Sequence, residues 1–227
     1  MLQSLQDLFF PPSCKSCSRH LQSSEYFICT ECRHHLPLTN YHKNNDDAIK
    51  KLFYGRLTLA NATALFHFEK RGGVQQLMHN LKYRGDKKIS GFLGEWLGYE
   101  LAQNPKYTQI DLVVPVPIHP KKKRTRGYNQ VDGFARAIAH HLDAKCRTDL
   151  LFKSKNTKTQ VFKGRFTRSD EVFEAFSISN THSEEEHHIL LVDDILTTGA
   201  TLEACAIQLL QIPNTVSYTH LTLPTKA

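Results

Sequence analysis

The stretch that decides the fold is ILLVDDILTTGATL, residues 189–202. An apolar run leads into two adjacent carboxylates, Asp193 and Asp194, and then into Thr197-Thr198-Gly199-Ala200-Thr201. The pattern predicts a buried strand over 188–194 and a helix over 199–210. In open α/β sheets, ligands bind at the carboxyl ends of the strands. There the Thr-rich turn would direct backbone N–H groups and hydroxyls at an anion, with help from the helix dipole.

The carboxylate pair adds a second requirement on a ligand at this strand end. Carboxylates accept hydrogen bonds from vicinal hydroxyls, and Gly199 lets the backbone approach without a Cβ. The combination favours a phosphorylated ligand that carries several hydroxyls. The alternative is a strand end with two solvated acids and a threonine helix cap.

Strands and helices alternate along the rest of the chain. Residues 59–69 and 110–117 have strand patterns, and the second run stops at Pro115 and Pro117. Apolar residues recur at helical spacing in three stretches, one of which starts near Asn129: Val74, Leu77, Met78 and Leu81; Phe92, Leu93, Trp96, Leu97 and Leu101; and Val131, Phe134, Ile138 and Leu142. This order predicts an α/β fold with a mostly parallel sheet. Residues 150–168 have no clear period and are expected to form a long loop.

Positive charge is concentrated in one block. The chain has 227 residues and a formal net charge of +7. Residues 106–168 hold 15 Lys and Arg against 4 Asp and Glu, a net +11, centred on Lys121, Lys122, Lys123, Arg124 and Arg126. Such a field favours a polyanionic partner such as phosphate, pyrophosphate or nucleic acid. A solvated basic loop is the alternative.

Four cysteines form two knuckles near the start of the chain: Cys14, Cys17, Cys29 and Cys32, in the pattern C-x2-C-x11-C-x2-C. Two thiolates from each tight turn can complete a tetrahedral four-sulfur site without an open position. A segment this short has no core of its own, so a metal would supply most of its folding energy. We therefore predict a structural Zn2+ site.

Other roles for the cysteines are weaker. Disulfides do not suit a chain that looks cytosolic, and a redox pair needs only one knuckle. His34 is the alternative ligand if one cysteine does not bind. Cys146 and Cys205 lie within apolar helical patterns and are expected to be core residues.

The remaining organisation follows from composition. No apolar run is long enough for a transmembrane helix, and MLQSLQDLFFPP has no signal-peptide pattern, so we expect a cytoplasmic protein without membrane insertion. Residues 40–51 are polar and turn-rich. We predict a four-cysteine module over 1–40, a linker over 41–58 and an α/β domain over 59–215.

Four motifs, in order, carry a resemblance. Residues 189–202 resemble the phosphoribosyl-pyrophosphate (PRPP) motif of type I phosphoribosyltransferases. With the cysteine knuckles, LKYRGD (81–86) and DLVVPVPIHPKKKRTRGYNQ (111–130), the chain is similar to the ComF (GntX-like) family over residues 8–211. Members of that family are linked to competence and DNA uptake. The resemblance implies a phosphoribosyltransferase-like fold with a small N-terminal zinc ribbon.

The resemblance also assigns roles. Asp193 and Asp194 would be the catalytic pair that binds the ribose hydroxyls. Thr197, Thr198, Gly199, Ala200 and Thr201 would hold the 5′-phosphate. Arg124, Arg126 and Gly127 would face pyrophosphate, because planar guanidinium groups suit its oxygens. Mg2+ would bridge pyrophosphate and ribose. A mobile loop would close over the site, and Lys153, Lys155, Lys158 and Lys163 lie in its region.

The chain departs from the family at two places. Gln160, Arg168, Ala175 and Phe176 match a family run in which Glu171 and Glu174 replace Asn and Gly. The end, VSYTHLTLPTKA (216–227), resembles translated sequencing-adapter sequence, so we expect it to be non-native and assign it no function. A genuine strand over VSYTHLTL is the alternative, since its polarity alternates.

The sequence leaves three candidate functions. The first is an enzyme that transfers ribosyl phosphate from PRPP to an unknown acceptor. The second is a nucleic-acid accessory protein that uses the cysteine module and the basic block, with PRPP as a regulatory ligand or relic. Its partners would be single-stranded DNA and competence or DNA-processing proteins. A metal-redox protein ranks last.

Overall fold

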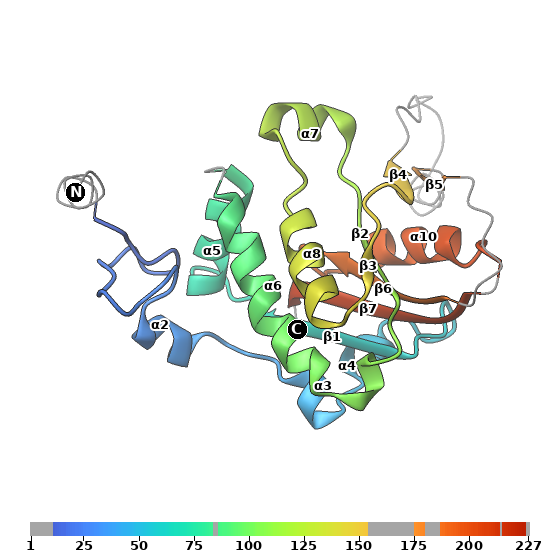
Figure 1. Cartoon of the computed structure of the whole chain (residues 1–227), viewed down its shortest axis with the longest axis horizontal. Coiled ribbons are helices and arrows are strands. Elements are labelled where there is room, and N and C mark those ends of the chain that lie inside the picture. The colour runs from blue at the N-terminus through green and yellow to red at the C-terminus, as the bar shows by residue number, and fades with distance from the viewer. Residues whose placement is uncertain (1–10, 84–85, 154–174, 180–186, 214, 226–227) are drawn as a thin grey trace.

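The core of the protein is a five-stranded sheet with the order β1-β7-β6-β2-β3. The computed structural model describes residues 11–83, 86–153, 175–179, 187–213 and 215–225. The strands are β1 (Asn61–His67), β2 (Leu112–Pro115), β3 (Lys145–Cys146), β6 (His187–Asp193) and β7 (Thr215–Thr225). Every pairing within this sheet is parallel. The predicted α/β fold with a mostly parallel sheet is confirmed (Figure 1).

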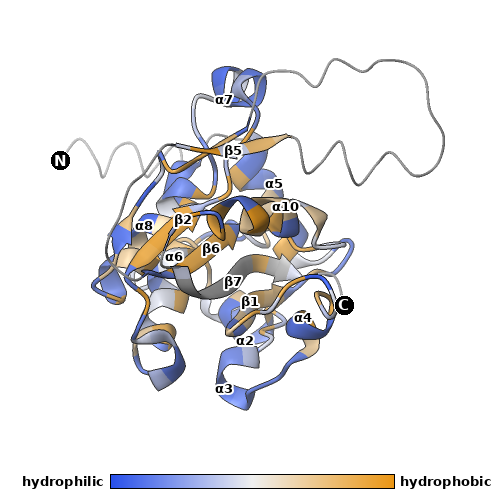
Figure 2. Cartoon of the chain, turned by 90° about the vertical axis from the view of Figure 1, so that its right-hand side faces the viewer, coloured by the Kyte–Doolittle hydropathy of each residue, from blue (hydrophilic) through white to orange (hydrophobic). Residues whose placement is uncertain are grey.

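Helices cover both faces of the sheet. On one side lie α5 (Gly73–Tyr83), α6 (Lys87–Ala102) and α8 (Asp132–His141), and on the other lies α10 (Ala200–Leu209). Along β6, Leu190 packs with the first set of helices, whereas Ile189 and Leu191 pack with α10. Strands β2 and β6 are buried on both faces, so the runs LVVP of β2 and ILLV of β6 are apolar throughout instead of alternating (Figure 2).

Two glycines let α6 and α8 approach closely. A Cβ on Gly94 would lie 2.6 Å from the carbonyl oxygen of Phe134, and one on Gly98 would lie 2.9 Å from the His141 ring. Ser90 fixes the same contact, since its hydroxyl donates to the Gln130 carbonyl at 2.6 Å and accepts from the Phe134 N–H at 2.8 Å. The position of α8 is therefore tied to α6.

The cysteine segment is docked on the helical layer. It ends in α2 (Thr30–His35), and its apolar residues Ile28 and Leu36 belong to the core that includes α5 and α6. The Asn80 amide donates to the Lys15 carbonyl at 2.8 Å, and the Lys15 ammonium lies 3.0 Å from Asp86. These contacts come from α5 and from the residue that precedes α6.

The segment between the cysteine module and the sheet is built into the core. It forms the short helices α3 (Tyr41–Asn44) and α4 (Ala48–Lys51). Ile49 and Phe53 are buried against the α10 side of the sheet. The domain boundaries at 40 and 58 stay predictions.

The remaining elements lie near the carboxyl ends of the strands or connect the layers. They are the 3-10 helix η1 (Pro105–Tyr107), the basic helix α7 (Pro120–Arg126), and an antiparallel pair of short strands, β4 (Leu151–Lys153) and β5 (Phe176–Ile178). None of the helices in the described part of the chain combines the length and apolar character needed to cross a bilayer. Most of the predicted long loop, residues 154–168, lies outside the described residues.

Three sequence predictions need comment. Cys146 lies in β3 and is half-buried, so its assignment to a buried helix was wrong, whereas Cys205 is buried in α10 as predicted. Helix α8 begins at Asp132 instead of near Asn129, because the Asn129 side chain bonds to the Val116 carbonyl and the Val131 N–H. Strand β7 lies between β1 and β6, and the assignment of 216–227 as a non-native tail stays a prediction.

Candidate functional site

The carboxylate pair lies at the end of β6. Asp193 is the last residue of the strand and Asp194 follows it, and both are buried. The Asp194 N–H donates to the Asp193 carboxylate at 2.7 Å. Burial, together with the neighbouring Asp194 charge, raises the pKa of Asp193 to about 7. Asp193 can therefore hold or release a proton near neutral pH.

Two residues from distant parts of the sequence converge on Asp194. The Lys82 ammonium, from α5, lies 2.7 Å from Asp194 Oδ2. The Gln130 amide donates to the same oxygen. The ammonium group and the amide donor, both on one oxygen, fix the orientation of the carboxylate.

The Thr-rich turn follows as predicted at the start of α10. Gly199 has φ +80°, in the left-handed region, and a Cβ there would lie 2.7 Å from the Phe53 ring. Thr197 and Thr198 are exposed, while Ala200 and Thr201 are half-buried. Asp193 and residues 195–202 line a hollow of about 30 Å³. An anion would therefore lie at the mouth of this turn, where the first N–H groups of α10 are free of helical partners.

The basic residues of the turn after β2 lie at two different places. Arg126 hydrogen-bonds to the Gln130 side chain, which in turn contacts Asp194, and its guanidinium lies 6.0 Å from the centre of the Tyr83 ring. Gly127 ends α7 with φ +80°. Arg124 instead lines a separate pocket together with Lys123. The structure thus links Arg126 to Asp194 through Gln130, whereas Arg124 lines the pocket.

Of the predicted loop lysines, Lys153 lies in the described part of the chain. It is at the end of β4, with its ammonium 4.6 Å from the centre of the Phe176 ring. The positive charge of Lys153 partly offsets the rise in the pKa of Asp193 that burial causes. Lys155, Lys158 and Lys163 lie outside the described residues, as do Gln160, Arg168, Glu171 and Glu174.

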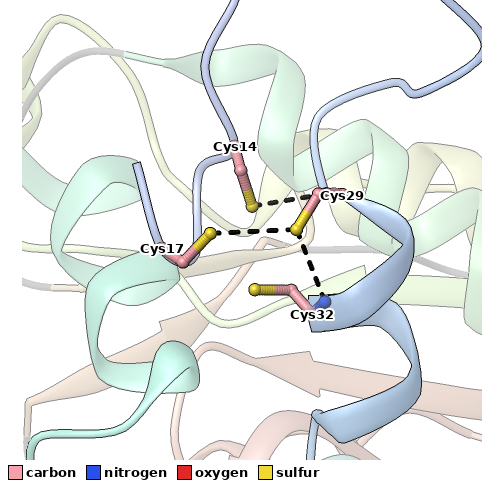
Figure 3. A group of neighbouring side chains, drawn as sticks. All are labelled: Cys14, Cys17, Cys29 and Cys32. Atoms are coloured by element: carbon pink, nitrogen blue, oxygen red, sulfur yellow. Dashed lines mark hydrogen bonds between the residues drawn. The ribbon is translucent and has the colours of Figure 1, made fainter. Parts of the chain in front are cut away.

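The four knuckle cysteines converge on one point, as Figure 3 shows. All four Sγ atoms lie within 4.8 Å of one another, and those of Cys17 and Cys29 are 3.8 Å apart. A tetrahedral ion with Zn–S bonds of about 2.3 Å separates its sulfurs by about 3.8 Å. The sulfurs are too far apart for a disulfide. The four side chains therefore fit one zinc ion without His34.

Backbone N–H groups point at these sulfurs. The Cys29 N–H donates to Cys14 Sγ at 3.3 Å, and the Cys32 N–H donates to Cys29 Sγ at 3.4 Å. Burial raises the pKa of the Cys14 thiol, but backbone donors outweigh this effect and lower it to about 7. Burial dominates at Cys32, whose pKa is raised. A bound cation would favour the thiolates at both positions.

Comparisons with known proteins agree with this geometry. Residues 133–212, from α8 to just beyond α10, match the model of the phosphoribosyl transferase domain family. The chain is 25% identical over 203 residues to the DNA utilization protein YhgH of Escherichia coli (strain K12), covering 87% of this chain and 84% of that protein. The chain is therefore similar to YhgH over most of its length, and its residues 133–212 are similar to a phosphoribosyl transferase domain.

Two further relatives carry competence names. The chain is 28% identical over 130 residues to Competence protein F of Haemophilus influenzae, covering 56% of this chain and 57% of that protein. It is 26% identical over 151 residues to Competence protein ComFC of Bacillus subtilis, covering 66% and 59%. The matched domain begins after α7, so the cysteine cluster and the basic helix lie outside it.

The sequence alone indicated no role for Lys82 or Gln130. Both lie in stretches that carried the family resemblance, LKYRGD and GYNQ. The Tyr128 hydroxyl donates to the Leu81 carbonyl and joins the two stretches. The available signal was the position of Lys82 directly after the apolar stripe of its helix, which leaves its side chain at the edge of the buried face.

Proposed function

We propose that this protein, like the ComF family it resembles, binds PRPP with Mg2+ and transfers the ribosyl phosphate of PRPP to an acceptor. The observation that carries the proposal is the arrangement at the end of β6, where the buried pair Asp193–Asp194 is followed by the Thr-rich turn at the start of α10. A sugar phosphate needs both parts, because its hydroxyls require acceptors and its phosphate requires donors.

Each residue of the proposed site has a distinct task. Asp193 and Asp194 accept hydrogen bonds from the ribose hydroxyls, and residues 197–201 hold the 5′-phosphate. Lys82 and Gln130 position Asp194 through the contacts to Oδ2. Arg126 and Gly127 face the pyrophosphate. Arg124, in the neighbouring pocket, is proposed to contact the outer pyrophosphate oxygens.

In the proposed transfer, the acceptor replaces pyrophosphate at C1 of the ribose. The bond from ribose C1 to pyrophosphate breaks, and its electron pair leaves on the pyrophosphate. The nucleophilic atom of the acceptor forms the new bond to C1 and releases its proton. The oxygen donors at the end of β6 fit Mg2+, which prefers carboxylates and phosphate oxygens. When bound, Mg2+ neutralises charge on the leaving pyrophosphate.

The test is calorimetric titration of the zinc-loaded protein with PRPP and Mg2+. We expect saturable, Mg2+-dependent binding that falls roughly hundredfold or more in Asp193→Asn/Asp194→Asn, because two charge-assisted contacts are lost. Asp149→Asn removes an exposed carboxylate elsewhere and should bind PRPP like the wild type. No binding to folded wild-type protein would refute the proposal. Pyrophosphate release with candidate acceptors then tests turnover.

The second candidate function is a non-catalytic one in DNA uptake. The relatives are called DNA utilization and competence proteins, and helix α7 offers the exposed side chains Lys121, Lys122 and Lys123. In this function a cytoplasmic protein contacts single-stranded DNA and competence or DNA-processing proteins, and PRPP is a regulatory ligand. The zinc module would provide a further contact surface.

The salt dependence of DNA binding tests this candidate. We expect Lys121→Gln/Lys122→Gln/Lys123→Gln to reduce the slope of log affinity against log salt by about 2 to 3 for a single-stranded oligonucleotide, because each neutralised phosphate contact releases about one counterion. Fluorescence anisotropy at several salt concentrations measures the slope. A control triple variant at the exposed Lys51, Lys70 and Lys106 should keep it. Equal slopes in both variants would contradict a role for α7.

A further inference from the structure

A residue between α4 and β1 packs directly against the Thr-rich turn at the start of α10. Phe53 is fully buried, and a Cβ atom on Gly199 would lie 2.7 Å from two carbons of its ring. Gly199 is the residue that caps the N-terminus of α10. Because the contact leaves no free space, a shift of the ring would displace the backbone of the turn.

Arg56 joins the segment that contains this ring to α10. Its guanidinium lies 5.5 Å from the centre of the Phe53 ring, within the range of a cation–π contact. The same group donates hydrogen bonds to the Leu52 carbonyl and to the Glu203 carboxylate, which lies 147 positions further along the chain. The ring and the Leu52 carbonyl thus hold the guanidinium next to Glu203.

Glu203 places a buried carboxylate in the first turn of α10. Only 7% of the residue is exposed, and Arg56 is its ion-pair partner among the described residues. Helical side chains lean toward the N-terminus of their helix, so this carboxylate is directed toward the Thr-rich turn. A negative charge in the first turn stabilises the helix but repels an anion that binds at the same end. The counterion is therefore needed if the turn is to hold a phosphate.

We propose that Arg56 is a positioning residue of the sugar-phosphate site. It neutralises the buried charge of Glu203, so that the first turn of α10 stays closed against Phe53 and accepts an anion. Arg56 acts through these two neighbours and makes no contact with the ligand. Its importance for PRPP rests on the proposed function, whereas its effect on the turn does not.

Two single variants and their combination separate this role from a purely structural ion pair. We expect Arg56→Gln to weaken the binding of PRPP with Mg2+ by about tenfold in calorimetry, because the unpaired Glu203 charge repels the phosphate. Arg56→Gln/Glu203→Gln should regain most of this affinity, because no unpaired charge remains. Glu203→Gln alone should bind at least as tightly as the wild type. A purely structural ion pair predicts no recovery, since the double variant also lacks the pair.

Hydrogen exchange of the ligand-free protein tests the same role without PRPP. In Arg56→Gln, opening of the first turn of α10 would bring the unpaired carboxylate into water. Amide exchange in a peptide spanning residues 195–203 should therefore accelerate by about tenfold, and the double variant should return toward the wild-type rate. Arg147→Gln is the matched control, because the Arg147 side chain is 37% exposed against 39% for Arg56 and pairs with Asp149. It should change neither readout.

Three results would overturn the role of Arg56. They are wild-type PRPP affinity in Arg56→Gln, a double variant that binds PRPP no more tightly than Arg56→Gln, and unchanged exchange of the turn in Arg56→Gln. The two proposals fail separately. If folded wild-type protein does not bind PRPP, the transferase is refuted and the exchange rates alone decide the role of Arg56. If PRPP binds equally to the wild type and to Arg56→Gln, the proposed PRPP site stands and the role of Arg56 is refuted.

Discussion

Asp193 is a carboxyl group whose protonation is coupled to folding. It is buried at the end of β6, and burial raises its pKa to about 7, against about 3.9 in an unfolded chain. Between these two values the native state holds a proton that the unfolded state has lost. Stability is therefore highest below the unfolded pKa and falls as pH rises toward about 7.

The variant Asp193→Asn removes this pH-dependent loss. Relative to the wild type, its free energy of unfolding should rise between about pH 4 and about pH 7, by up to about 4 kcal/mol, and then level off. Urea unfolding of the zinc-loaded protein at about pH 5 and about pH 8 measures the difference. Asp149, whose pKa is lowered by a hydrogen bond from Arg147, is the control, because Asp149→Asn should gain no stability at the higher pH. Equal variant and wild-type pH profiles would contradict the buried assignment.

At the scale of elements, short-range patterns predicted the helices and strands well. The apolar stripe of Val74, Leu77, Met78 and Leu81 lies on the buried face of α5. The run at 188–194 forms β6, displaced by one residue. The apolar pattern placed the start of α8 near Asn129 instead of at Asp132. The Asn129 side chain, which is not part of the apolar stripe, bonds to the backbone before the helix begins. The patterns also failed for Cys146, which lies in a strand of only two residues.

The cysteine knuckles form an element that depends on its metal. We expect one zinc ion per chain by elemental analysis. We also expect Cys17→Ser to lose most of the zinc and to lower the melting temperature by about 5 °C or more. Ile28 and Leu36 pack against α5 and α6, so unfolding of the cysteine module would also remove packing from the rest of the domain and destabilise it.

The matched control is Cys146→Ser, because Cys146 is a half-buried thiol outside the cluster. It should keep one zinc per chain. A zinc-free wild type with an unchanged melting temperature, or equal zinc contents in both variants, would contradict a structural metal site.

At the scale of the whole molecule, the candidate site is an assembly of segments far apart in the sequence. Asp194 is contacted by Lys82, which precedes it by more than one hundred positions, and by Gln130, which precedes it by more than sixty. The parallel order of β2 and β6 brings the turn after β2 next to the carboxylates. Contacts between distant segments leave no pattern within either segment. The sequence therefore revealed the motifs but not the contacts between them.

The sequence by itself determined the α/β class, the parallel sheet, the cysteine cluster and the position of the carboxylate pair before a Thr-rich turn. Each of these follows from local periodicity or from residue spacing within one segment. Only the tertiary structure decided that Lys82 and Gln130 converge on Asp194, and that Arg126 bonds to Gln130 while Arg124 lines a pocket with Lys123. The physical reason is that burial, pKa and charge at a site depend on neighbours supplied by chain packing.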